Sequence, residues 1–104
     1  MIQSAAPIER LIPDEVLEFC AQHHLLPQLE TAVRLAELHF APCRDLTLGM
    51  ETDPETSERT VVIDVTLSMD VAEVIKRKQA YTREWVAVAT PNAREQIRLL
   101  YNII

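Results

Sequence analysis

Glycine is almost absent from this chain of 104 residues, in which Gly49 is the only one. Phosphate-binding loops and dinucleotide fingerprints are built on several glycines, because the backbone must turn tightly and approach the phosphates closely. The sequence therefore excludes P-loop and dinucleotide-binding motifs.

Cysteine and long apolar runs are also scarce. The two cysteines, Cys20 and Cys43, are too few for a disulfide framework, and we expect both to be free thiols. No apolar run approaches the ~18 residues that a membrane span needs. The segment Met1–Pro7 has neither a basic opening nor a long apolar stretch. We therefore expect a cytoplasmic protein with no membrane association.

Basic residues are scarce until late in the chain. Before Lys76 there are 14 Asp or Glu against four Lys or Arg, and from Lys76 onward there are six Lys or Arg against two Asp or Glu. Such a charge distribution suits an acidic protein partner or a second copy of the chain, whereas the net charge of −6 opposes nucleic acid. The predicted partner-binding residues lie on one helix face and are Lys76, Arg77, Lys78 and Arg83.

Hydrophobic residues make up 48% of the chain, which is enough for one core but not for two. We therefore expect a single domain over residues 1–104. The first dozen residues, 1–12, are expected to be loosely ordered.

Two helices are predicted in the first half of the chain. Apolar residues at helical spacing predict one helix from Pro13 to about His24 and another from Pro27 to just before Pro42. Because the connection is short, the two are expected to pack as an antiparallel helical hairpin.

A period of two replaces the helical period from Leu46 onward. Apolar and polar residues alternate up to Glu51, and a second alternating run follows the turn signal Asp53-Pro54, so the sequence predicts a β-hairpin. One register places all of the apolar residues on one face. It pairs Leu46 with Val65, Leu48 with Ile63 and Met50 with Val61.

A long helix and a short one are predicted in the second half. Asp70 and Glu73 have the spacing of a capping box, and the apolar stripe that follows makes Trp85 the largest core residue. Thr90-Pro91-Asn92 separates the long helix from the short one. The segment 97–103 fits both a helix and a strand, and we favour a strand because a two-stranded hairpin alone is only marginally stable.

Together these elements predict an α+β fold: a helical hairpin, a β-hairpin, a long helix, a short helix and a C-terminal third strand, with one layer of helices on a small sheet. The segment 97–103, together with Arg83-Glu84-Trp85, resembles small bacterial proteins that carry no assigned function. The resemblance implies a bacterial protein and no particular activity.

Four residues have a spacing similar to that of zinc sites, Cys20-x2-His23 followed by His39-x3-Cys43. The first pair lies at the end of one predicted helix and the second pair at the far end of the next. The segment from Gln28 to His39 spans about 16 Å of helix at about 1.5 Å per residue, whereas the ligands of one zinc lie within about 2.3 Å of the metal. We therefore expect no bound metal and no cofactor.

Three residues are candidates for catalysis. His39 and Cys43 are four residues apart, as a thiol nucleophile and its base could be, but Cys43 follows a helix C-terminus, where the helix dipole disfavours the thiolate. Asp64 lies in the middle of a strand on the polar face, which makes it a solvated residue unless that face is covered. The sequence thus offers no convincing reactive group.

The function predicted from the sequence is a non-enzymatic protein-interaction module. The module would be a homodimer or the small subunit of a bacterial protein pair, with the contact made by the basic helix face or by a sheet edge, 46–50 or 99–103. A small enzyme that uses His39, Cys43 or Asp64 is one alternative. An RNA-binding accessory protein that uses the basic helix face is the other.

Overall fold

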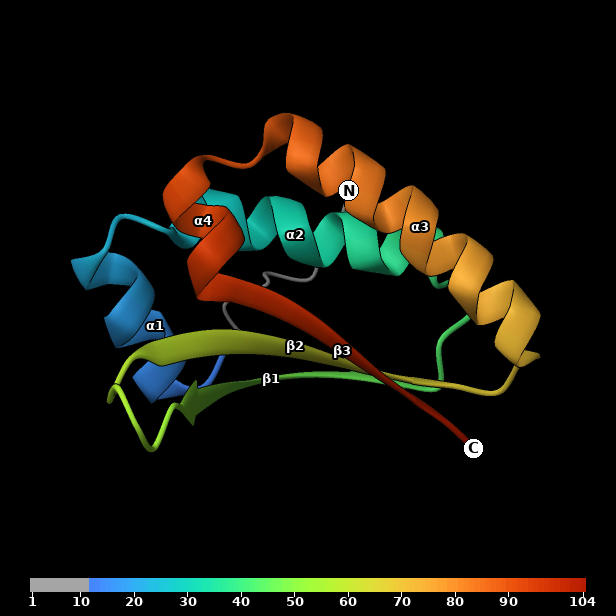
Figure 1. Cartoon of the computed structure of the whole chain (residues 1–104), viewed down its shortest axis with the longest axis horizontal. Helices are drawn as coiled ribbons and strands as arrows, with labels where there is room; N and C mark the ends of the chain where they lie inside the picture. Colours follow the sequence, from blue (N-terminus) through green and yellow to red (C-terminus); the bar gives the residue numbers. More distant parts are fainter. Residues whose placement is uncertain (1–11) are drawn as a thin grey trace, which may run out of the picture.

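A computed structural model describes residues 12–104 as two layers, a sheet and a set of helices on one of its faces. It confirms the predicted α+β fold. The expectation for residues 1–12 lies outside the described residues, apart from Ile12, whose side chain is buried. In chain order the elements are α1 (Asp14–Gln22), α2 (Leu26–His39), β1 (Asp45–Thr52), β2 (Arg59–Leu67), α3 (Val71–Val88), α4 (Pro91–Gln96) and β3 (Ile97–Ile103) (Figure 1).

β2 is the central strand of the sheet, because β1 pairs with one of its sides and β3 with the other. β1 and β2 are antiparallel in the predicted register, with Leu48 opposite Ile63. Residues 97–103 form the predicted third strand, which runs parallel to β2 with Ile97 opposite Val61. A parallel pair needs a crossover of a dozen or more residues, and α3 and α4 supply it.

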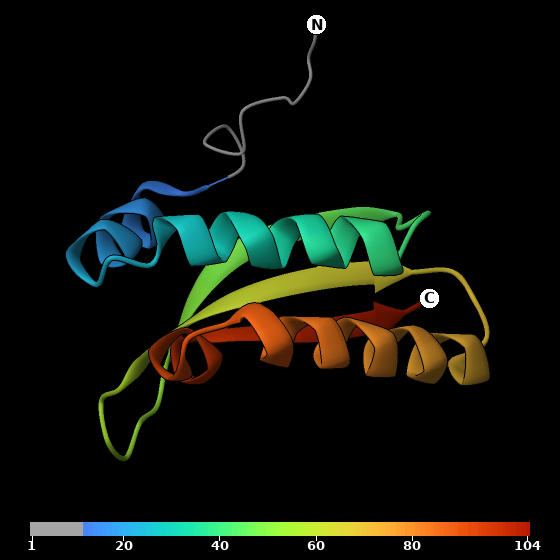
Figure 2. The ribbon, with the colours of Figure 1, turned by 90° about the horizontal axis from the view of Figure 1, so that it is seen from above.

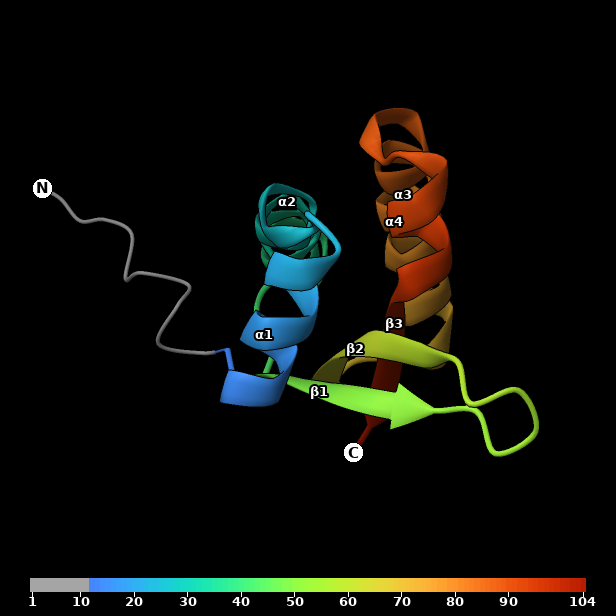
Figure 3. The ribbon, with the colours of Figure 1, turned by 90° about the vertical axis from the view of Figure 1, so that its left-hand side faces the viewer.

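The alternation of residues on β2 decides which face of the sheet the helices cover. Val61, Ile63, Val65 and Leu67 are fully buried, whereas Asp64 between them is only half-buried. α2 and α3 lie side by side above the buried face, with α2 nearer β1 and α3 nearer β3 (Figures 2 and 3). No described element covers the opposite face, which we call the open face.

The core lies between the sheet and the helices. Trp85 of α3 is 6% exposed and is, as predicted, the largest core residue. Phe40, at the end of α2, packs against Tyr81 of α3 with ring centroids 5.9 Å apart. α1, α2 and α3 contribute further buried side chains, among them Val16, Leu29, Val33 and Val74.

The start of α3 differs from the prediction. Asp70 is its N-cap, but the side chain of Asp70 makes no capping hydrogen bond, so the predicted capping box is wrong. Glu73 instead receives a hydrogen bond at 2.8 Å from Nε of Arg77, one turn further along the helix. The guanidinium offers this carboxylate a charged donor, which the backbone N–H of Asp70 does not.

The end of α1 is a Schellman motif. The N–H of Leu25 donates to the carbonyl of Cys20 at 2.8 Å, and the N–H of His24 donates to the carbonyl of Ala21 at 3.4 Å. His24 has a φ of 57°, in the left-handed region where a Cβ is unfavourable. The connection to α2 therefore places a strained residue at His24.

Replacing His24 with glycine is expected to raise the free energy of unfolding by about 0.5–1 kcal/mol, because glycine adopts this φ without a steric penalty. Chemical denaturation followed by circular dichroism measures the change. His24→Ala, which removes the imidazole but keeps Cβ, is the matched control and should change stability by less than about 0.5 kcal/mol. A less stable glycine variant would contradict the backbone explanation.

Candidate functional site

β3 is an edge strand whose outer side has no partner within residues 12–104. Natural edge strands are commonly blunted by charges, prolines or bulges, because their free N–H and C=O groups attract other strands. β3 contains seven residues with no proline and one charge, Arg98. Three of its apolar side chains are partly in solvent, with exposed fractions of 38% for Leu100, 40% for Tyr101 and 38% for Ile103. β3 is therefore an unprotected edge.

β1, the opposite edge strand, is better protected. It carries two exposed acidic residues, Asp45 and Glu51. Glu51 also forms a 3.0 Å ion pair with Arg98, which reaches across the open face from β3. Carboxylates on an edge oppose the addition of another strand, so the two edges of this sheet are not equivalent.

α3 presents an apolar stripe beside the β3 edge. Val71, Ile75 and Val86 are 59%, 47% and 46% exposed, and with Thr82 they recur at helical spacing on one side of the helix. A groove of about 390 Å³ separates this side of α3 from β3. The residues that line the groove include Tyr81, Trp85, Ile97 and Leu99, together with the basic Lys78 and Arg94, and no carboxylate. We call the stripe, the groove and β3 together the β3-side surface.

The four predicted partner-binding residues do not share one face of α3. Lys76 and Arg83 are exposed and lie seven residues apart on the same side of the helix. Lys78 lines the groove beside β3. Arg77 is turned toward α2, so two of the four side chains, those of Lys76 and Arg83, form the free basic surface of the helix.

Arg77 joins α3 to the end of α2. Its Nη1 donates to the carbonyl oxygens of His39, at 3.2 Å, and Ala41, at 2.6 Å, while its Nε binds Glu73. The last carbonyls of a helix have no partner within the helix itself, so Arg77 supplies a donor to the carbonyl of His39, the last residue of α2, and to that of Ala41 just beyond it. The spacing Glu73-x3-Arg77 is a helical ion-pair signal that sequence reasoning could have used.

The cysteines and histidines that the sequence suggested as zinc ligands or catalytic residues do not come together in one site. Nε2 of His39 lies 3.1 Å from Oε1 of Glu84, and this contact links α2 to α3. Cys43 is half-buried against the core. Cys20 is fully buried in α1, and desolvation raises the pKa of its thiol to about 11, which suppresses the reactive thiolate. Within the described part of the chain, no group of three or more His, Cys, Asp or Glu residues is placed to share a metal ion.

Asp64 lies on the open face, as alternation predicts. Its Oδ1 accepts a hydrogen bond of 2.5 Å from the side-chain amide of Asn102 on β3. Because β2 pairs with both neighbours, Asp64 has Thr47 on one side and Leu100 on the other. Its carboxylate thus cross-links two strands on a face that no described element covers.

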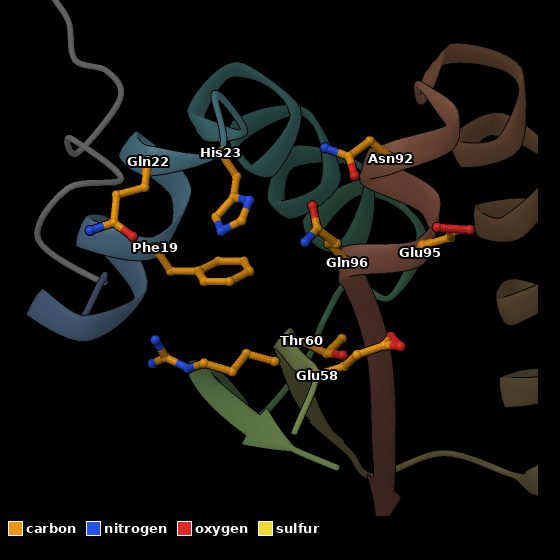
Figure 4. Close-up of a pocket in the computed structure, with 9 residues that line it drawn as sticks. Phe19, Gln22, His23, Glu58, Thr60, Asn92, Glu95 and Gln96 are labelled. Carbon is orange, nitrogen blue, oxygen red and sulfur yellow. The ribbon is translucent and has the colours of Figure 1, made fainter. Parts of the chain in front are cut away.

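A second hollow, of about 400 Å³, lies between the end of α1, the start of β2 and α4 (Figure 4). In Figure 4, His23 faces Asn92 and Gln96 of α4 across the hollow. His23 also stacks on Phe19 with ring centroids 4.3 Å apart. Oε1 of Gln96 is buried and has no hydrogen-bond donor among residues 12–104. The hollow offers donors and acceptors to a small polar molecule.

Among the residues of this hollow, sequence reasoning considered a functional role only for His23, as a zinc ligand in a site that it then rejected. The hollow combines segments near residues 19–23, 58–60 and 92–96. No local pattern connects segments so far apart in the sequence, so the folded chain alone reveals the site.

None of the described helices is long and apolar enough to cross a membrane. No protein-family model, no curated protein and no solved structure matches the chain.

Proposed function

We propose that the protein is a non-enzymatic protein-interaction module, which binds by accepting an extended strand at the free edge of β3. The observation that carries the proposal is the unprotected apolar edge, continuous with the exposed stripe on α3. An added strand would satisfy the free N–H and C=O groups of β3, and its side chains would remove the apolar stripe from water.

The partner is a second copy of the chain. β3 is itself an extended strand with apolar side chains and a single charge, so it has the chemistry that its own free edge accepts. A surface that complements itself gives a closed two-fold dimer, the commonest symmetry of soluble oligomers. Exposed edge groups and apolar side chains would then be buried in both copies at once.

The proposal is tested by sedimentation velocity at tens of micromolar. We expect a dimer, and we expect Leu100→Lys to weaken association about tenfold or more, since two lysines, one from each copy, would be brought to the apolar contact. Thr47→Lys makes the same kind of change at an exposed position of the other edge strand and should leave association unchanged. A monomeric wild-type protein, or equal effects of the two substitutions, would overturn the proposal.

Salt separates this contact from one made by the basic helix face. The Debye length falls from ~10 Å at about 0.1 M salt to ~3 Å at about 1 M, so pairing between exposed charges weakens, whereas backbone and apolar pairing does not. We expect the dimer to persist at the higher salt concentration. A dimer that dissociates there would assign the contact to Lys76 and Arg83 on the exposed side of α3 and contradict strand addition.

A further inference from the structure

We infer that two copies pair antiparallel through β3 about a two-fold axis at Leu100. The result is one six-stranded sheet, in which each copy inserts Tyr101 and Ile103 beside the groove of the other. This inference rests on the proposed function and adds the orientation and register of the partner.

The free hydrogen-bonding groups of β3 belong to alternate residues. The N–H of Ile104 donates to the carbonyl of Leu67 on β2 at 2.9 Å. Because successive peptide groups of a strand point to opposite sides, the even-numbered residues of β3 bond to β2 and the odd-numbered ones turn outward. The edge available to a partner is therefore that of Leu99, Tyr101 and Ile103.

This alternation restricts the register. In an antiparallel pair, two residues that exchange hydrogen bonds must both point to the shared edge, so odd-numbered residues must face odd-numbered ones. Aligning the whole of Ile97–Ile103 with its own reverse meets this condition and gives the longest overlap. The N–H of Ile97 already donates to the carbonyl of Ala93 in α4, so the pair of Ile97 with Ile103 would form one new hydrogen bond and the pair of Leu99 with Tyr101 would form two. Leu100 then lies on the two-fold axis, opposite Leu100 of the second copy.

The side chains are complementary in this register. Ile97 faces Ile103 of the second copy and Leu99 faces its Tyr101, so both pairs on the helix side of the sheet are apolar. On the open face Arg98 faces Asn102 of the second copy, so no like charges are directly opposed. Apolar and aromatic cross-strand pairs stabilise a sheet, and like charges destabilise it.

The groove between α3 and β3 has space for side chains of the second copy. Ile97 and Leu99 line the groove together with Trp85 and Lys78 of α3. Tyr101 and Ile103 of the second copy, adjacent to Leu99 and Ile97, would project toward the same space. The apolar ring of Tyr101 would cover apolar lining, and its hydroxyl is suited to Lys78, the basic side chain on the α3 wall.

The two-fold axis also accounts for the apolar stripe on α3. α3 of the second copy would run in the opposite direction, so that the first half of one helix faces the second half of the other. Val71 and Ile75 lie in the first half, and Val86 lies in the second. Each exposed apolar end of the stripe would then have an apolar counterpart in the partner.

Disulfide cross-linking tests the register. In a Cys43→Ser background, Leu100→Cys should form a disulfide-linked dimer under mild oxidation, because facing residues of a non-hydrogen-bonded antiparallel pair have Cα atoms about 4.5 Å apart. A mixture of Arg98→Cys and Asn102→Cys chains should cross-link likewise, and either alone should not. Thr47→Cys, on β1, is the control. We expect cross-linking at Leu100 roughly a hundredfold faster than at Thr47, since a held contact has a millimolar effective concentration.

The outcomes separate this inference from the proposed function. A dimer by sedimentation that fails to cross-link at Leu100, or that cross-links equally well at Thr47, would overturn the inferred register and leave the interaction module standing. A wild-type protein that sediments as a monomer would overturn both the inferred register and the proposed function. Circular dichroism of each cysteine variant shows that it is folded, and the Arg98→Cys and Asn102→Cys mixture tests the same register without changing Leu100.

Discussion

Trp85→Ala is expected to lower the free energy of unfolding by about 3–5 kcal/mol, the range found when large aromatic side chains are truncated in cores. Trp85 is 6% exposed and lies where α3 meets the start of β3. Its removal would leave a cavity beneath the groove. Since small domains are stable by only about 5–15 kcal/mol, the loss would be a large part of the total.

The measurement is a denaturant titration followed by far-ultraviolet circular dichroism, because Trp85 is the only tryptophan and the variant loses its fluorescence. Gln79→Ala, at an exposed position of the same helix, is the control and should change stability by less than about 0.5 kcal/mol. A loss below about 1 kcal/mol for Trp85→Ala would show that this ring is not part of the core.

Arg77→Ala is expected to destabilise the protein by about 1.5–3 kcal/mol, because a charged donor is removed from two main-chain carbonyls and one carboxylate. The carbonyls belong to His39 and Ala41 at the end of α2 and the carboxylate to Glu73. The side chain of Arg77 is 31% exposed, so water can replace some of the lost hydrogen bonds. The loss of stability should therefore be smaller than that of a core truncation. The same denaturant titration measures it.

Two controls identify the cause. Arg77→Lys should recover little of the loss, since a single ammonium does not reproduce the planar fork of the guanidinium. Lys76→Ala, at the exposed neighbouring position, should be close to neutral. An Arg77→Ala variant with unchanged stability but weakened association would instead support the partner-binding role that the sequence suggested for Arg77.

The β-hairpin was predictable because its pattern is local and two-sided. Leu48 and Ile63 must both point into the core. A shift of the register by one residue would turn the apolar side chains to the solvent face, so the alternation of residues is enough to decide the register. The strand at 97–103 was predictable on a different ground, the need of a two-stranded hairpin for a third strand.

Other features depend on tertiary contacts that no local pattern contains. The direction of β3 follows from the crossover through α3 and α4, and strand periodicity is the same for both directions. The capping box was wrong because Glu73 has a charged competitor in Arg77. Arg77 was assigned to a free surface because its carbonyl partners, on His39 and Ala41, lie more than thirty residues earlier in the chain.

The candidate site was only partly predictable. The sequence indicated that 99–103 could be a sheet edge suited to self-association, but it gave the same role to 46–50. Both segments are edge strands because β2 lies in the centre of the sheet, so the choice between them depends on the exposure and charge of side chains such as Tyr101 and Glu51. The groove depends on the distance between α3 and β3, a tertiary property that residue spacing does not contain.

The parallel pairing of β2 with β3 also constrains how the chain acquires its structure. The turn at 53–58 closes the hairpin over six residues, whereas Ile97 lies 36 positions after its partner Val61. Closing the longer loop costs more chain entropy, so contacts of this separation form more slowly. We expect the β1–β2 hairpin to form early. β3 would pair with β2 late, after α3 has become helical. Until then, the edge of β2 that β3 will occupy could pair with a strand from another chain. Newly synthesised chains would therefore be most prone to aggregation before the ribosome has added residues 97–103.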